Sequence, residues 1–307
     1  MGRLATRLGL DGPAPNGSFG PGEGRYNCRM SERFVDKLAA AVKGNDSLVC
    51  VGLDPDPLQM AVPNVVAFNR AIIEATADLV CAFKPNLAFY EALGDGGWSA
   101  LRATLDAIPD NIPVIADAKR GDIGNTSAAY AHAVFDLLGA DAMTVNAWGG
   151  IEAVEPFLEY EDRGVLVWCR SSNPSAGDFQ DLQVDYDGER RPLWQAVALK
   201  AAEWNEHGNV GIVMGATYPE QLADARRLCP DMPILVPGVG AQAGALRESV
   251  RAGITRSGDG IIVNASRAVL YASHDAADFA VAARAAAQRL RDEINRHRFD
   301  RVVTLEG

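Results

Sequence analysis

The chain has few cysteines, and none has a metal-binding or redox spacing. Its five cysteines are far apart and odd in number, and no CxxC pair occurs. This pattern argues against a disulfide framework and against a structural zinc site. Three of them (Cys50, Cys81 and Cys169) lie inside apolar runs, where a cysteine usually acts as a small hydrophobic residue. We therefore predict a reducing compartment, the cytoplasm.

Long apolar runs and excess basic charge are also missing. No apolar run reaches the roughly 18 residues that a membrane-spanning helix needs. The chain of 307 residues has 29 Lys and Arg against 40 Asp and Glu, a formal net charge of -11. Such a balance argues against a nucleic-acid or membrane partner. It leaves a small molecule as the expected substrate, which could be anionic if a local basic pocket holds it.

The first 29 residues differ in composition from the rest. They are rich in Gly and Pro and show little periodicity. We predict a flexible extension over 1–29, a catalytic domain over 30–300 and a short tail over 301–307. An amphipathic stretch opens the domain at 31–44, and Ser31 is its expected N-cap.

Eight short apolar runs alternate with helical patterns from Ser47 onward. The runs are apolar nearly throughout, as strands of a parallel sheet buried on both faces are. Eight strand–helix units predict an α/β fold, a single-domain (β/α)8 TIM barrel. A doubly wound sheet fits less well, because no GxGxxG turn follows the first run. The runs span 47–54, 79–86, 112–119, 141–148, 164–172, 209–216, 233–240 and 260–267.

Charged residues end the third run, in the stretch ADAKRGDIGNT. Asp117 and Lys119 are two positions apart, so regular strand alternation would place both on one face. Lys84 from the neighbouring run can join them, and Asp122 follows in the turn. Such an array can destabilise a substrate carboxylate, then stabilise and protonate a carbanion. It favours decarboxylation or another carbanion reaction, with a structural ion-pair network as the alternative.

A glycine-rich turn follows the seventh run, and an arginine follows the eighth. In PGVGAQ (237–242), Gly238 and Gly240 would let backbone N–H groups approach a ligand closely. Arg267 could form a bidentate pair with a phosphate. Loops after the last two strands commonly bind phosphate in barrel enzymes, so we expect a phosphorylated ligand. Two ordinary turns are the alternative.

The segment 171–192, after the fifth run, has no clear periodicity. Loops of this length in compact domains are often lids or binding loops. Ser172, at its start, could hydrogen-bond a flat polar ligand.

Together these motifs resemble those of the orotidine 5'-phosphate decarboxylase family. DAKRGDIGNT is similar to the family's DxKxxDIxxT signature. VGLDPDP, AFKPNLAFYEALG, PGVGAQ and NASR resemble its other strand-end motifs, in the same order. The similarity covers roughly residues 31 to 300 and looks closest to the longer bacterial branch. It implies conversion of orotidine 5'-phosphate to uridine 5'-phosphate and CO2 in pyrimidine biosynthesis, without metal or organic cofactor. It also implies a homodimer with active sites at the subunit interface.

The resemblance further implies a role for each matching residue. Lys84, Asp117, Lys119 and Asp122 would form a charged tetrad, with Asp122 coming from the partner chain. Lys119 would protonate the C6 carbanion, and Asp117 would lie against the leaving carboxylate. Substrate contacts would come from Asp54 at the ribose, from Ser172 (or Ser171) at the pyrimidine, from Pro237, Gly238, Gly240, Gln242 and Arg267 around the phosphate, and from the partner's Ile123 and Thr126.

Two other functions stay open. An enzyme resembling keto-gulonate 6-phosphate decarboxylase would share the DxKxxD motif but use a magnesium ion. That family places an acidic metal ligand where this chain has Lys84, which repels a cation. A barrel that binds nucleotides without catalysis is the second alternative. Binding alone does not need costly buried charge, so the tetrad argues against it.

Overall fold

Eight parallel strands form a closed barrel in the computed structural model, which describes residues 32–215, 219–238 and 243–299. The hydrogen-bonded order is β2-β1-β10-β9-β8-β5-β4-β3, and isolated bridges from Phe83 to Val114 and from Asn86 to Asp117 close the ring. The predicted TIM barrel is confirmed. The strands are β1 (Val49–Leu53), β2 (Ala82–Pro85), β3 (Ile115–Arg120), β4 (Ala142–Val145), β5 (Gly164–Arg170), β8 (Val210–Met214), β9 (Ile234–Pro237) and β10 (Ile261–Ala265).

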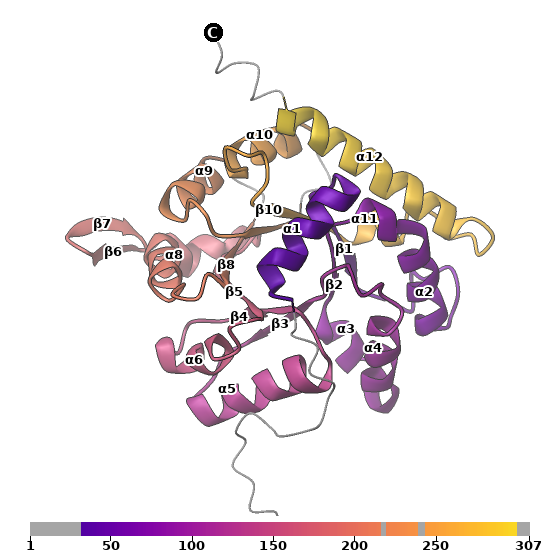
Figure 1. Cartoon of the computed structure of the whole chain (residues 1–307), viewed down its shortest axis with the longest axis horizontal. Helices are drawn as coiled ribbons and strands as arrows, with labels where there is room; N and C mark the ends of the chain where they lie inside the picture. The colour runs from indigo at the N-terminus through magenta and orange to yellow at the C-terminus, as the bar shows by residue number, and fades with distance from the viewer. Residues whose placement is uncertain (1–31, 216–218, 239–242, 300–307) are drawn as a thin grey trace, which may run out of the picture.

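Helices surround the barrel on its outside (Figure 1). Amphipathic patterns explain their placement: α2 buries Phe68, Ile72 and Ile73, and the Asn64 side chain caps its first turn by accepting from Ala67 N. None of the helices in the described ranges is long and apolar enough to cross a membrane. The helices are α2 (Val65–Thr76), α3 (Leu87–Glu91), α4 (Gly97–Leu105), α5 (Gly124–Ala131), α6 (Glu155–Leu158), α8 (Leu193–Glu203), α9 (Pro219–Leu228), α10 (Ala243–Gly253), α11 (Arg267–Leu270) and α12 (Phe279–Phe299), with a π-helical turn η3 (His132–Leu137) after α5.

Strand alternation divides the core into two apolar layers. One lies between the strands and the outer helices, and it takes Val49, Val51 and their equivalents on the other strands. The other fills the barrel interior. Because successive side chains on a strand point to opposite faces, each strand serves both layers at once. The interior layer contains Cys50, Ala82, Ile115, Ala142, Leu166, Val213, Leu235 and Ile262.

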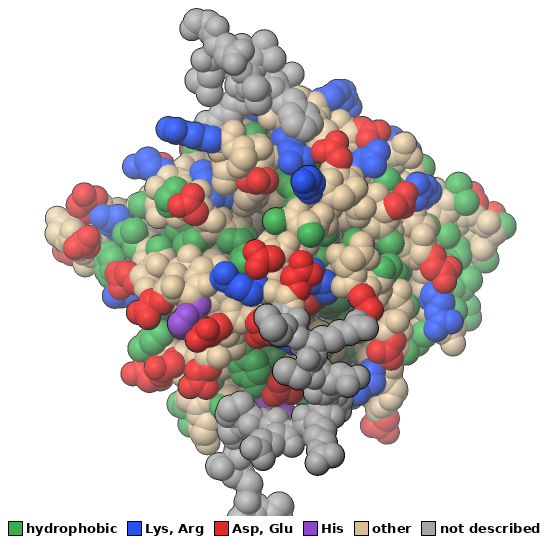
Figure 2. Space-filling view, in the orientation of Figure 1, with side chains coloured by type: hydrophobic (Ala, Val, Ile, Leu, Met, Phe, Trp, Pro, Cys, Tyr) green, Lys and Arg blue, Asp and Glu red, His purple; other side chains and the backbone are tan. Residues whose placement is uncertain are grey.

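The helix α1 (Phe34–Asn45) covers the end of the barrel where the strands begin (Figure 1). Phe34 and Leu38 from α1 pack against the interior layer, and Phe34 N donates to Asp162 O at 2.9 Å. Lys37 pairs with Asp141 at 2.8 Å. The expected N-cap Ser31 lies outside the described residues, and Arg33 occupies the N-cap position instead. On this face of the molecule, side chains of both charge signs are interspersed (Figure 2).

The segment after β5 is more regular than the sequence predicted. It contains a 3-10 turn η5 (Pro174–Ala176), a short helix α7 (Gly177–Gln180) and an antiparallel hairpin of β6 (Gln183–Tyr186) and β7 (Glu189–Pro192). Asp187 and Gly188 form the turn with φ of 53° and 74°. Positive φ at both positions is typical of a two-residue hairpin turn, so Asp-Gly was the overlooked signal. Residues 1–29 and 301–307, the predicted extension and tail, lie outside the described residues.

Candidate active site

The candidate site is the next inward-facing layer of the barrel, above the interior apolar layer and away from α1. Each of its residues follows an interior residue of the same strand by two positions, so alternation brings them to one level. Barrel enzymes carry their active sites at this end, where the strands finish. The layer contains Gly52, Lys84, Asp117, Thr144, Trp168 and Asn264.

Asp117 lies at the centre of this layer and pairs with two lysines. Its Oδ2 accepts from Lys84 Nζ at 2.7 Å, and its Oδ1 accepts from Lys119 Nζ at 2.5 Å. Burial raises the pKa of Asp117, but Lys84 and Lys119 outweigh it and hold the pKa at about 2. Burial would lower the pKa of Lys84, yet Asp117 and Asp54 together keep it raised. Both groups are therefore charged at neutral pH.

Lys119 reaches Asp117 by a different route from the one predicted. Regular alternation does not hold here: Lys119 has φ of 47°, and the β3–β4 register shifts between Ala116 and Arg120. This bulge still places the Lys119 ammonium against Asp117. It also leaves the side chain 37% exposed, whereas that of Lys84 is 4% exposed. The Lys119 ammonium lies 5.9 Å from the centre of the Trp168 ring.

A tight turn connects β3 to α5 and carries three predicted residues. The buried Ser127 hydroxyl holds the turn by accepting from Asp122 N and donating to Ala153 O at 2.9 Å. Asp122 and Ile123 are exposed, and Thr126 is half-buried. Asp122 Oδ1 accepts from Ile123 N at 2.7 Å. Among the described residues, the Asp122 carboxylate forms no ion pair with Lys84 or Lys119.

Asp54 follows β1 and lies beside Lys84. Its Oδ1 is buried and has no hydrogen-bond partner among the described residues, and the same is true of Asn264 Oδ1. The backbone at Asp54 is fixed, because Tyr271 donates its hydroxyl proton to Asp54 O at 2.8 Å. Two buried acceptors without partners, close to a charged pair, are suited to hydroxyl groups of a ligand.

The predicted phosphate site is only partly described. Pro237 ends β9, and Gly238 follows with φ of 87°. A side chain at Gly238 would approach Ser172 Oγ, which shows that the loops after β5 and β9 meet. Arg267 begins α11 with an exposed side chain. Gly240 and Gln242 lie outside the described residues.

Ser171 and Ser172 differ in their surroundings. Ser171 is buried, its N donates to Gln180 Oε1 at 2.9 Å, and its Oγ accepts from Asn173 N at 3.0 Å. Ser172 is exposed. Arg170, also buried, pairs with Asp181 at 2.9 Å and so fixes the start of this segment. The sequence reading missed Arg170, although a charge inside an apolar run was its signal.

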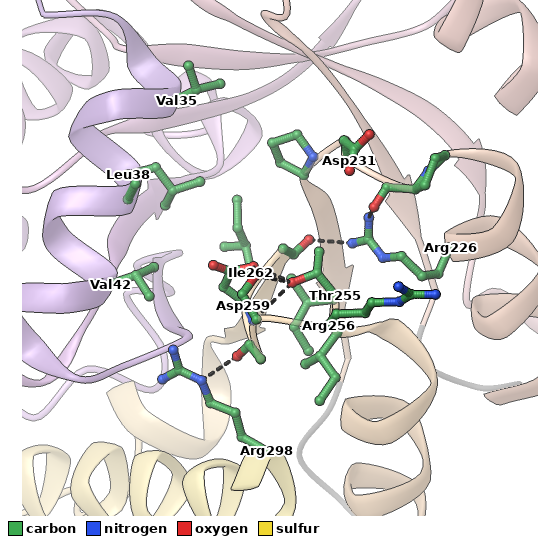
Figure 3. Close-up of a pocket in the computed structure, with 18 of the residues that line it drawn as sticks. Val35, Leu38, Val42, Arg226, Asp231, Thr255, Arg256, Asp259, Ile262 and Arg298 are labelled. Carbon is green, nitrogen blue, oxygen red and sulfur yellow. Dashed lines mark hydrogen bonds between the residues drawn. The ribbon is translucent and has the colours of Figure 1, made fainter. Parts of the chain in front are cut away.

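A cavity of about 1680 Å³ lies at the opposite end of the barrel, between α1 and the loops before β9 and β10 (Figure 3). None of the predicted site residues lines it. Arg226 points its guanidinium at backbone carbonyls, including those of Gly253, Met232 and Gly260. Thr255 and Ser257 hydrogen-bond the Asp259 carboxylate. These polar groups hold the connecting loops together, and we assign them a structural role.

Comparisons with known proteins agree with the geometry. The model of the Orotidine 5'-phosphate decarboxylase / HUMPS family matches residues 47–282. The chain is 54% identical over 272 residues to orotidine 5'-phosphate decarboxylase of Thermomicrobium roseum (86% of this chain, 96% of that protein). It is 49% identical to the enzyme of that name from Dehalococcoides mccartyi (87% and 98%).

A solved structure of the same kind matches the fold. Leishmania donovani OMP decarboxylase superposes with a TM-score of 0.77 at 41% identity, covering 87% of this chain and 99% of that one. The chain therefore belongs to the orotidine 5'-phosphate decarboxylase / HUMPS family.

Proposed function

We propose that this chain converts orotidine 5'-phosphate to uridine 5'-phosphate and CO2, as a step of pyrimidine biosynthesis in the cytoplasm. The observation that carries the proposal is the charged trio: a buried, ionised Asp117 held between Lys84 and Lys119 at the C-terminal end of a barrel. Relatives about 50% identical over most of the chain have the name of this activity.

The trio accounts for both halves of the reaction. A substrate carboxylate beside the Asp117 carboxylate is repelled, and the repulsion ends when the carbon–carbon bond breaks and CO2 leaves. The electron pair stays on C6, where the Lys119 ammonium stabilises it and then donates a proton to it. Lys84 does not need to react. Its buried charge keeps Asp117 ionised and in place.

The surrounding residues have the chemistry to bind the rest of the substrate. Asp54 Oδ1, buried without a partner among the described residues, would accept from a ribose hydroxyl. Ser172 would contact the pyrimidine, because it is exposed and its hydroxyl faces Gly238 in the loop after β9, whereas Ser171 is buried. Arg267, at the start of α11 after β10, would bind the phosphate, assisted by the backbone at 237–240 and by Gln242.

The proposal includes a homodimer whose subunits share active sites. Asp122 and Ile123 project from the turn after β3, and Ile123 is 67% exposed. Trp148, on the next turn, is 77% exposed. An exposed carboxylate flanked by large apolar side chains is suited to a contact with a second copy. In that arrangement Asp122, Ile123 and Thr126 would complete the partner's site.

Lys84 also separates this proposal from the magnesium-dependent alternative. A carboxylate at this position could bind a divalent cation, whereas a buried ammonium paired with Asp117 repels one. We therefore propose that the reaction uses no metal or organic cofactor.

A spectrophotometric assay tests the proposal. The purified chain should consume orotidine 5'-phosphate at the same rate before and after exhaustive chelation, and should leave keto-gulonate 6-phosphate unchanged. Turnover of the second substrate that is lost on chelation and restored by magnesium would favour the alternative. Tight nucleotide binding without turnover of either substrate would favour a non-catalytic barrel.

A further inference from the structure

Thr144 connects two members of the charged trio through one hydroxyl group. It lies on β4, faces the barrel interior and is buried. Its Oγ1 lies 2.9 Å from Asp117 Oδ1 and 3.0 Å from the backbone N of Lys119. None of the sequence motifs contains it, although a polar threonine inside the apolar run AMTV (142–145) is a signal of a buried hydrogen bond.

The two hydrogen bonds have fixed directions. A backbone N–H can only donate, so the hydroxyl oxygen accepts from Lys119 N. An ionised carboxylate can only accept, so the hydroxyl proton goes to Asp117. The Thr144 hydroxyl therefore accepts one hydrogen bond from Lys119 and donates one to Asp117. These two bonds fix its orientation.

The bulge in β3 explains why a side chain is needed at this position. The β3–β4 ladder loses its register between Ala116 and Arg120, and Lys119 has a left-handed conformation. A non-glycine residue with positive φ is strained by about 1–3 kcal/mol and persists only where its surroundings hold it. The Thr144 hydroxyl provides the acceptor for the Lys119 N–H at the break in the ladder.

We propose that Thr144 is a positioning residue that sets the distance and direction between the Lys119 ammonium and the Asp117 carboxylate. The inference rests on the proposed function, in which these two groups act on the same substrate carbon. Thr144 itself does not transfer a proton. It keeps the Asp117 carboxylate oriented and holds the Lys119 backbone in the conformation that turns its side chain toward Asp117.

Thr144→Val and Thr144→Ser test the proposal together. Valine keeps the shape but removes the hydroxyl, and we expect kcat to fall about 10- to 100-fold, since a hydrogen bond to a charged group is lost. KM should stay within about threefold, because ribose and phosphate contacts are untouched. Serine keeps the hydroxyl and should restore kcat to within about fivefold of wild type.

Thr76→Val is the matched control. Thr76 is also buried, and its hydroxyl donates to Ile72 O at 2.7 Å inside α2. The Thr76→Val substitution should lower the melting temperature without changing kcat. If Thr144→Val behaves like Thr76→Val, with lower stability and unchanged kcat at a temperature where it is folded, the positioning role is wrong.

A measurement without substrate separates this inference from the proposed function. Amide hydrogen exchange at Lys119 should be at least tenfold faster in Thr144→Val and near wild type in Thr144→Ser. A wild-type chain that does not decarboxylate orotidine 5'-phosphate would refute the proposed function. Unchanged Lys119 exchange in the valine variant would refute the role of Thr144, whatever the activity.

Discussion

Lys84 and Lys119 both pair with the Asp117 carboxylate, but they differ in their exposure to solvent. Lys84 is enclosed by protein, so its charge is held permanently by Asp117 and Asp54. Lys119 is partly open to solvent and projects from a bulge. A group that gives up a proton in each cycle must recover it, and access to water favours Lys119 for that task. The enclosed lysine is better suited to a fixed electrostatic role.

Lys119→Ala should abolish turnover and leave the fold intact. The proposed proton donor is removed, but Asp117 keeps its ion pair with Lys84, so no buried charge is left without a partner. We expect a loss of at least about 10³-fold in kcat with near-wild-type melting temperature and retained binding of uridine 5'-phosphate. Lys37→Ala is the control, because Lys37 also pairs with an aspartate, Asp141, at the other end of the barrel. A folded Lys119→Ala protein with normal turnover would contradict the proposed mechanism.

Asp117 should also make stability depend on acid pH. Its pKa is about 2 in the folded chain, below the ordinary aspartate value of 3.8. Because the pKa is lowered on folding, the ionised carboxylate adds about 2 kcal/mol to the free energy of unfolding above about pH 4. This contribution is lost as the pH falls toward 2. In Asp117→Asn the free energy of unfolding should therefore depend less steeply on pH in this window. Chemical unfolding near pH 5 and near pH 3 measures the difference, and parallel pH dependence in both proteins would contradict it.

At the scale of elements, the sequence predicted the barrel strands. It did not predict the β6–β7 hairpin or the bulge in β3. All eight barrel strands were predicted, each within a few residues of its bounds, because a run buried on both faces is apolar throughout. The hairpin β6–β7 was missed, since its exposed strands lack such a run. The bulge at Lys119 was missed because it depends on Thr144 of the neighbouring strand, and no local pattern in ADAKRGD reveals it.

The turn after β3 provides a test at this scale. A side chain at Gly121 would place its Cβ 2.0 Å from Asn146 O, so the two loops approach too closely for any other residue. Gly121→Ala should lower the free energy of unfolding by several kcal/mol and displace Asp122, with loss of activity. Gly44→Ala, in α1, meets no atom within 4 Å and should leave stability unchanged or raise it by about 0.5–1 kcal/mol. Equal stability of both variants would contradict the close approach.

At the scale of the whole molecule, the two ends of the barrel differ. The helix α1 covers one end, and the charged trio occupies the other. Asp122 stands outside this trio within its own chain. A second copy is therefore what the proposed site requires to gain its fourth charge.

Mixing two inactive variants tests this sharing. In a mixed dimer of Lys119→Ala and Asp122→Ala chains, one active site would contain both substitutions and the other would contain neither. We expect up to about a quarter of wild-type activity at equal mixing, since half of the dimers are mixed and each has one intact site. Subunit exchange must be verified with differently tagged chains. A mixture that exchanges but stays inactive would place Asp122 within its own chain's site.

Packing of α1 against the barrel interior has a consequence for chemical labelling. Cys50 lies in that interior, level with Ala82 and one layer below Lys84, and burial raises the pKa of its thiol to about 12. Cys81, Cys169 and Cys229 are buried as well. With Cys28 replaced by serine, the native chain should react with an alkylating reagent only when the barrel opens. The labelling rate would then report the opening equilibrium of the barrel, and rapid labelling of Cys50 in the folded enzyme would show that reagent can reach the interior without unfolding.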